Sequence, residues 1–241
     1  MSLKILLLQA RNHDDLAKDE ERRSFAQKAG LDIEQIVPHD LLAEPPSLRK
    51  VISYDAMMVG GSGDYYVSKG NLPGFSQVLE TIQEVVARGH PTFASCFGFQ
   101  LMVKALGGEI VNDVAGMEVG TYQLTLTKAG QQDELLGTLP HQFYAQLGRK
   151  DRAAQLPSGS VNLASSRLCP FQAMRIPHKP IWATQFHPEL TGEENRIRFS
   201  RYLQGYAFVM SEEERRATLN RFQESPETPA LILRFLELVF G

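Results

Sequence analysis

The chain has 241 residues, of which 43% are hydrophobic and 22% are charged, and its formal net charge is −3. These values are ordinary for a globular protein and give no reason to expect nucleic acid or an anionic membrane as a partner. The two cysteines, Cys96 and Cys169, are too few for a disulfide framework or a zinc ribbon. The first apolar run, residues 5–8, is too short for a signal peptide or a membrane span, so we expect a cytoplasmic protein.

The first half of the chain alternates between apolar runs and segments with helical spacing. Strands are expected over residues 3–8, 31–37 and 54–59, with a fourth that ends at Cys96. Helices are expected before Gly30, over residues 72–88, and from the bend at Cys96 to residue 106. This order predicts a doubly wound α/β domain with a flavodoxin-like, mostly parallel sheet. The sites of such sheets lie beyond the carboxyl ends of the strands.

The second half is built from shorter segments. Six strands are expected, over residues 109–111, 121–127, 142–147, 161–164, 171–176 and 181–186, as antiparallel additions to the same sheet. Helices are expected over residues 193–206, 211–222 and 229–240. We therefore predict one domain over residues 1–241, with a catalytic core over 1–190 and a helical C-terminal extension over 191–241. The apolar face of the last helix needs a cover, from its own domain or from a second subunit.

Cys96 follows an apolar run and precedes a helical segment, with small residues two positions before and after it, Ala94 and Gly98. This is the pattern of a nucleophile elbow, where the cramped backbone demands small neighbours. A cysteine at such a bend faces a helix N-terminus, whose dipole favours the thiolate. The alternative is a small buried hydrophobe, the usual role of a lone cysteine.

A base for this cysteine is offered by an apolar run that ends in His187, Pro188 and Glu189. Residues two apart on a strand project to the same side, so Glu189 is able to orient the imidazole of His187. Taken alone, the histidine is equally well read as a surface residue in a proline turn.

Three motifs in one order resemble the class I glutamine amidotransferase family, and within it the amidotransferase domains of GMP synthetases. They are Gly60-Gly61 after a strand, the Cys96 bend with Gly98 and Gln100, and the run of residues 185–189. The resemblance extends over nearly all of residues 3–190. It implies covalent catalysis by Cys96, with His187 as the base and Glu189 as its orienting partner.

The resemblance also implies the remaining site residues. The backbone N–H groups of Gly61 and Phe97 would form the oxyanion hole. Gly60, Gln100 and Glu118 would contact the substrate. No metal or organic cofactor is implied. The sequence departs from the family pattern at Ala94 and Phe99, and above all at Arg149, where related members have a histidine. That last change puts acceptor or partner recognition in doubt, and Cys169 is expected to be structural.

The implied reaction is the hydrolysis of glutamine through a Cys96 γ-glutamyl thioester, with release of glutamate and ammonia. No phosphate-binding loop is present in the sequence, so the acceptor of ammonia would be a separate synthetase chain. One alternative is a γ-glutamyl peptidase or hydrolase with the same triad. Another is a regulatory or binding domain that kept the fold and lost turnover. The oligomeric state is not predicted.

Overall fold

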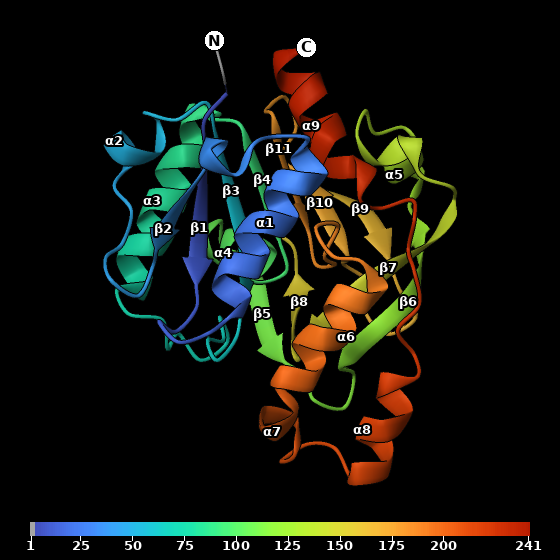
Figure 1. Cartoon of the computed structure of the whole chain (residues 1–241). Helices are drawn as coiled ribbons and strands as arrows, with labels where there is room; N and C mark the ends of the chain where they lie inside the picture. Colours follow the sequence, from blue (N-terminus) through green and yellow to red (C-terminus); the bar gives the residue numbers. More distant parts are fainter. Residues whose placement is uncertain (1–2) are drawn as a thin grey trace.

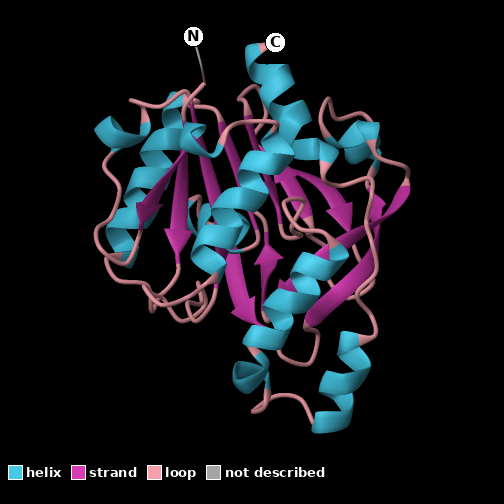
Figure 2. Ribbon diagram, in the orientation of Figure 1, coloured by secondary structure: helices cyan, strands magenta, loops and turns pink. Residues whose placement is uncertain are grey.

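A nine-stranded sheet forms the centre of the protein, in a computed structural model that describes residues 3–241 (Figure 1, Figure 2). Its strands, in order across the sheet, are β2 (Ile36–Asp40), β1 (Ile5–Ala10), β3 (Ala56–Ser62), β4 (Thr92–Ser95), β11 (Ile181–Thr184), β10 (Ala173–Arg175), β9 (Val161–Ser165), β6 (Glu118–Leu126) and β7 (Gln142–Arg149). The first five run parallel, and the last four join antiparallel. A separate ribbon pairs β5 (Glu109–Asn112) with β8 (Asp151–Gln155).

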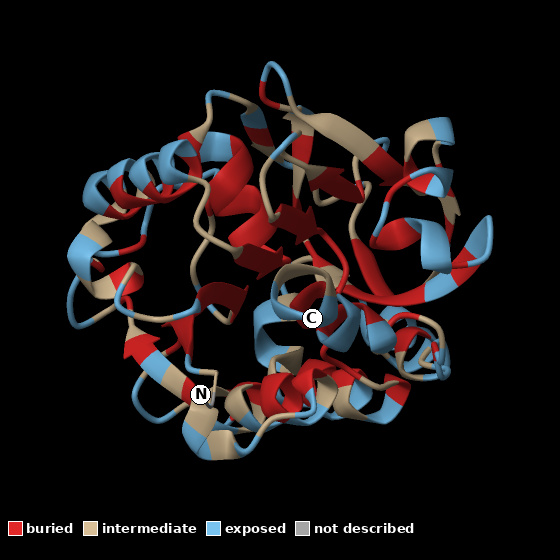
Figure 3. Ribbon diagram, turned by 90° about the horizontal axis from the view of Figure 1, so that it is seen from above, coloured by how far each residue is buried: buried red, intermediate tan, exposed pale blue. Residues whose placement is uncertain are grey.

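Helices cover both faces of this sheet. One face carries α1 (Ala17–Ala29) and α9 (Ala230–Phe240), and the other carries α3 (Phe75–Arg88) and α4 (Phe97–Ala105). Side chains alternate along a strand, so β1 serves both layers. Ile5 and Leu7 pack in the cluster with α1 and α9. Leu6 and Leu8 pack in the cluster with α3 and α4. Figure 3 shows the result, with buried residues through the centre and exposed residues on the outer faces of the helices.

The apolar face of α9 is covered by the chain's own sheet. Leu231, Ile232 and Phe235 are at most 1% exposed. The ring centroid of Phe235 lies 5.7 Å from that of Phe93 in β4 and 6.0 Å from that of Trp182 in β11. Of the two covers that the sequence allowed for this helix, the structure therefore shows the one from the same domain.

The other C-terminal helices lie at the end of the sheet to which β1 points (Figure 1). They are α6 (Gly192–Arg201), α7 (Leu203–Tyr206) and α8 (Glu212–Leu219). The expected single helix over residues 193–206 is broken at Tyr202. Phe199 and Val119 form a small third core beside them, with Tyr206 and Phe222 packed against it. The extension thus packs on the sheet at the end where parallel strands place their sites.

Some expectations were wrong in detail. The second strand begins at Ile36, because residues 33–35 form a 3-10 turn (η1, Ile33–Gln35) held by mutual capping of Asp32 and Gln35. β3 continues through Gly60 and Gly61 instead of ending before them. β11 pairs parallel with β4, and β5 pairs with β8, which the sequence had not indicated. The short elements α2 (Leu48–Val51), α5 (Lys128–Gln131) and η2 (Leu136–Thr138) were also not expected. Within residues 3–241, no helix is both long and apolar enough to cross a membrane.

Candidate active site

Cys96 lies at a sharp bend between β4 and α4. Its backbone has φ 51° and ψ −102°, which L-residues adopt only when the surrounding structure enforces it. Its N–H group donates to the carbonyl oxygen of Thr184 at the end of β11, at 2.8 Å. A Cβ atom at Gly98 would lie 2.7 Å from the carbonyl oxygen of Val59, so only glycine lets α4 pass this close to β3. The bend therefore has the strand–turn–helix geometry that exposes a nucleophile.

His187 and Glu189 follow the neighbouring strand β11. Thr184 of β11 pairs with Ser95 of β4, so the two strands end side by side and bring the histidine next to Cys96. Nδ1 of His187 lies 2.6 Å from Oε1 of Glu189, and the two residues are 4% and 0% exposed. This bond fixes the ring and leaves Nε2 as the nitrogen available to the thiol.

The charges in this group determine the protonation of the imidazole. Burial alone would lower the pKa of His187, but the negative charges of Cys96 and Glu189 outweigh it and raise the pKa to about 10. Burial favours the neutral form of Glu189, yet the adjacent imidazolium holds the pKa of that carboxyl below its usual range. The arrangement therefore favours a thiolate–imidazolium pair backed by a carboxylate.

The two backbone groups expected at an oxyanion hole have different surroundings. Phe97 is the first residue of α4, so its N–H group has no partner inside the helix, and the residue lines the cavity beside Cys96. The N–H group of Gly61 donates to Oε1 of Glu21 at 3.0 Å. In this structure it is therefore occupied, and a role for it in an oxyanion hole requires that bond to exchange.

Glu21 of α1 belongs to a buried network that was not expected from the sequence. It is 0% exposed and accepts hydrogen bonds from Arg11 at 2.8 Å and Gln9 at 3.0 Å, besides that from Gly61. A Cβ atom at Gly60 would lie 2.6 Å from the carboxyl carbon of Glu21. The glycine at position 60 thus makes room for this carboxylate. No local pattern in the sequence joins α1 to the end of β3.

Of the other expected substrate contacts, Gln100 is at the cavity and Glu118 is not. The side chain of Gln100 donates to the carbonyl oxygen of Asp151 and to Gln185, both at 3.1 Å. Glu118 is 0% exposed and forms an ion pair with Arg149. It also accepts hydrogen bonds from Ser166 at 2.6 Å and from Gln172 at 2.7 Å. The arginine at the departing position therefore has a dedicated buried carboxylate.

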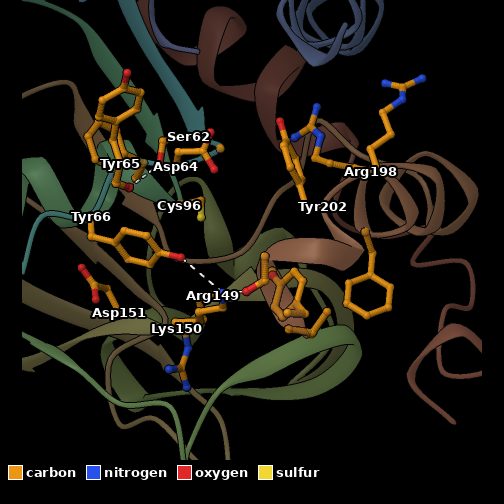
Figure 4. A pocket seen from close by; sticks show the side chains of 18 of the residues that line it. Ser62, Asp64, Tyr65, Tyr66, Cys96, Arg149, Lys150, Asp151, Arg198 and Tyr202 are labelled. Atoms are coloured by element: carbon orange, nitrogen blue, oxygen red, sulfur yellow. Dashed lines mark hydrogen bonds between the residues drawn. The ribbon is translucent and has the colours of Figure 1, made fainter. Parts of the chain in front are cut away.

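A cavity of about 370 Å³ joins these elements, which is a size suited to a small metabolite. Cys96, Phe97, Gln100 and His187 lie on its wall. Other contributors, which were not expected from the sequence, come from the loop after β3 and from the C-terminal extension: Ser62, Asp64, Tyr65, Tyr66, Arg198, Tyr202 and Tyr206 (Figure 4). Within residues 3–241, no group of three or more His, Cys, Asp or Glu side chains is placed to hold a metal ion.

Cys169 has none of this environment. It is 1% exposed, does not line the cavity, and its thiol lies 3.4 Å from the carbonyl oxygen of Phe171. Burial raises the pKa of the Cys169 thiol, which disfavours its reactive form. Its contacts are those of a structural cysteine.

Comparison with known proteins decides the family. The model of the class I glutamine amidotransferases matches residues 29–203, which is more than half of the chain. The chain belongs to the class I glutamine amidotransferase family. The fold agrees, since a glutamine amidotransferase from Thermotoga maritima superposes with a TM-score of 0.74 at 17% identity, over 99% of this chain and 98% of that one.

Relatives of this amidotransferase include parts of a larger enzyme. It is 30% identical over 164 residues to the glutamine-hydrolysing subunit of the GMP synthase of Methanothermobacter thermautotrophicus, covering 67% of this chain and 81% of the relative. The corresponding subunit of Methanocaldococcus jannaschii is 36% identical over 43% of this chain, which spans about half (53%) of that relative. A γ-glutamyl-L-1-hydroxyisopropylamide hydrolase from a Pseudomonas species is 33% identical, over 58% of this chain and 48% of the relative.

Proposed function

We propose that this amidotransferase hydrolyses the side-chain amide of glutamine at Cys96. The observation that carries the proposal is the juxtaposition at two neighbouring strand ends. Cys96 occupies a strained bend at a helix N-terminus, and a buried imidazole–carboxylate pair, His187 and Glu189, faces it from β11. A nucleophile, a base and a group that orients the base are what acyl transfer from an amide requires.

The reaction would run in two halves. The thiolate of Cys96 attacks the amide carbon and forms a tetrahedral intermediate. The protonated His187 gives its proton to the departing nitrogen, so ammonia leaves and a γ-glutamyl thioester remains. His187 then takes a proton from water, which attacks the thioester and displaces the thiolate. Glu189 keeps the ring oriented and stabilises its positive charge in both halves.

The negative oxygen of each intermediate needs donors. The N–H group of Phe97, at the start of α4, supplies one, with support from the helix dipole. We propose that the N–H group of Gly61 supplies the second once it exchanges its bond to Glu21 for one to the oxyanion. Gln100, buried on the cavity wall, is proposed to contact the γ-glutamyl chain.

Released ammonia is proposed to pass to a synthetase on another chain. The relatives named as subunits of GMP synthase support this, because such a name describes one part of an enzyme with several parts. The sequence supports it too, since Gly60-Gly61-Ser62-Gly63 lacks the lysine of a phosphate-binding loop. The identity of the acceptor is left open by both observations.

A second candidate is the hydrolysis of other γ-glutamyl amides, because the same thioester forms whatever amine departs. Two observations favour it: the relative that hydrolyses a γ-glutamyl hydroxyisopropylamide, and the aromatic lining of the cavity by Tyr65, Tyr66 and Tyr206. These rings offer apolar surface to a leaving amine larger than ammonia.

Incubation of the purified protein with glutamine and with several γ-glutamyl dipeptides separates the candidates, with ammonia and glutamate as the measured products. We expect both products from glutamine, and none when Cys96 is replaced by serine. Turnover of dipeptides without turnover of glutamine would support the second candidate. No turnover of any substrate, with Cys96 inert to a glutamine-like alkylating agent, would indicate a binding domain. Cys96→Ser activity above a hundredth of the wild type would contradict the assigned nucleophile.

A further inference from the structure

Cationic side chains line much of the cavity, and most of them are already neutralised. Arg11, Arg149 and Arg201 form ion pairs with carboxylates. Within residues 3–241, Lys150 and Arg198 line the same cavity without forming an ion pair with any carboxylate. Arg198 also borders a second hollow on the far side of α6, whereas Lys150 belongs to the catalytic cavity alone. Lys150 is therefore the uncompensated positive charge that faces the substrate space.

Lys150 lies between two walls of the cavity and has only neutral partners. Its Nζ atom lies 3.3 Å from the hydroxyl of Tyr66, donates to the carbonyl oxygen of Gly205 at 3.1 Å, and stands 4.2 Å from the ring centroid of Tyr206 (Figure 4). An ammonium group has three donors, so one is left. Partial burial among neutral groups lowers the pKa of Lys150, and a carboxylate at this point would compensate for that burial.

The position of Lys150 along β7 indicates which end of the substrate it meets. The N–H group of His187 donates to the carbonyl oxygen of Gln146 at 2.9 Å, so the catalytic histidine lies beside that residue. Lys150 follows four residues later, about 13 Å further along the extended chain. The amine departs on the side of His187, which protonates it. Lys150 therefore faces the opposite end of the substrate, where a γ-glutamyl compound has its α-amino and α-carboxylate groups.

The same cavity also carries negative charge that no cation neutralises. Asp64 and Asp151 line it, and within residues 3–241 neither forms an ion pair with lysine or arginine. Asp64 accepts a hydrogen bond from Asn12 at 2.9 Å, and Asp151 accepts from Ser68 at 2.7 Å. One free ammonium and two free carboxylates in one cavity complement a zwitterion, which is the form of a free amino-acid head group at neutral pH.

We propose that Lys150 is the specificity-determining residue that binds the α-carboxylate of the γ-glutamyl substrate. The inference rests on the proposed function and narrows it to γ-glutamyl compounds with a free α-carboxylate. Charge-assisted hydrogen bonds to a carboxylate are stronger than the bonds that Lys150 makes to neutral oxygens, so the substrate would replace one of them. The α-ammonium group would then meet the carboxylates on the same wall.

Glutamine and glutaminamide test this directly, because they differ only in the α-carboxylate. We expect the wild type to prefer glutamine by about 10–100-fold in kcat/KM, the range of one charge-assisted bond. Lys150→Met should bring the ratio close to one, chiefly by slowing glutamine, and Lys150→Arg should restore most of the preference. Lys69→Met is the matched control. The Nζ atom of Lys69 lies 4.3 Å from the ring centroid of Tyr66, but Lys69 does not line the cavity.

A purely structural Lys150, which only ties Tyr66 to Gly205, predicts another pattern. Its loss would slow glutamine and glutaminamide equally and leave their ratio at the wild-type value, and that result would overturn the proposal. The alkylation of Cys96 gives a second readout that needs no turnover. Lys150→Gln, which keeps hydrogen-bonding capacity, should slow labelling by 6-diazo-5-oxo-L-norleucine, which has an α-carboxylate, and leave labelling by neutral iodoacetamide unchanged. Equal effects on both reagents would also contradict the proposal.

Failure of the proposed function gives a different result. A wild-type protein that cleaves neither compound, and whose Cys96 resists both reagents, overturns the proposed reaction and this inference with it. A wild type that cleaves glutamine and glutaminamide equally well keeps the reaction and overturns the role of Lys150 alone.

Discussion

Two strand ends flank Cys96, and each holds a buried carboxylate that serves a different purpose. At the end of β11, Glu189 bonds to the imidazole of His187 at 2.6 Å. At the end of β3, Glu21 bonds to the backbone of Gly61 at 3.0 Å. Both carboxylates are 0% exposed, so neither is screened by solvent and each acts on its immediate neighbours.

The difference lies in what neutralises each charge. Glu21 has a permanent cation in Arg11, at 2.8 Å. Burial disfavours the charged guanidinium, yet the carboxylate outweighs it and raises the pKa of Arg11. Glu189 has only an ionisable imidazole, so its charge acts on the protonation of His187. A buried carboxylate with a permanent partner stabilises structure, and one with a titratable partner tunes a reaction.

The largest expected effect follows from removing the charge at β11. Glu189→Gln keeps the shape of the side chain and loses its negative charge, so the imidazolium is no longer stabilised. We expect kcat to fall by about 100-fold or more, in line with the orienting carboxylates of other triads. Steady-state glutamine hydrolysis measures this. Glu193→Gln, an exposed change four residues later, is the control and should leave kcat unchanged.

The matching change at β3 should act on stability instead. Glu21→Gln leaves Arg11 buried without a counter-charge, which costs about 3–5 kcal/mol in the free energy of unfolding. Glu20→Gln on the same helix breaks a partly exposed pair with Arg201 and should cost less than about 1 kcal/mol. Urea unfolding gives both values. Equal losses in the two variants would contradict the assigned role of the Arg11–Glu21 pair.

A smaller effect concerns pH. Since the pKa of His187 is raised from 6.5 to about 10, its charge contributes stability fully below pH 6.5, and this contribution is lost as pH rises toward 10. Cys96→Ala removes one of the two charges that raise this pKa, so the pKa of His187 should fall in the variant. NMR titration of the His187 ring measures the shift. An unchanged titration would mean that Cys96 does not influence the imidazole.

Much of this site was predictable because its signals are local. Small residues two positions from Cys96 indicated the bend, and the spacing of His187 and Glu189 placed them on one side of a strand end. The parallel strands of the first half were also expected, from their apolar runs. The structure brings Cys96, His187 and Glu189 to adjacent strand ends, while their catalytic roles remain the proposal that the experiments address.

The remainder depends on contacts between distant parts of the chain. Glu21 meets Gly61 across forty positions, and nothing in the pattern of a charged surface helix distinguishes it from its exposed neighbours. The pairing of β5 with β8 was missed because both strands are short and only partly apolar. The cavity wall supplied by Tyr202 and Tyr206 depends on how the extension turns back over the sheet, which helical periodicity does not encode.

The central claim is that Cys96 carries a γ-glutamyl group during turnover. Rapid mixing with glutamine, acid quenching and mass spectrometry of the resulting peptides tests it directly. We expect a γ-glutamyl adduct on the peptide that contains Cys96 and none on the peptide that contains Cys169, which serves as an internal control. Glutamate release without an adduct on Cys96, and undiminished in Cys96→Ala, would contradict the account.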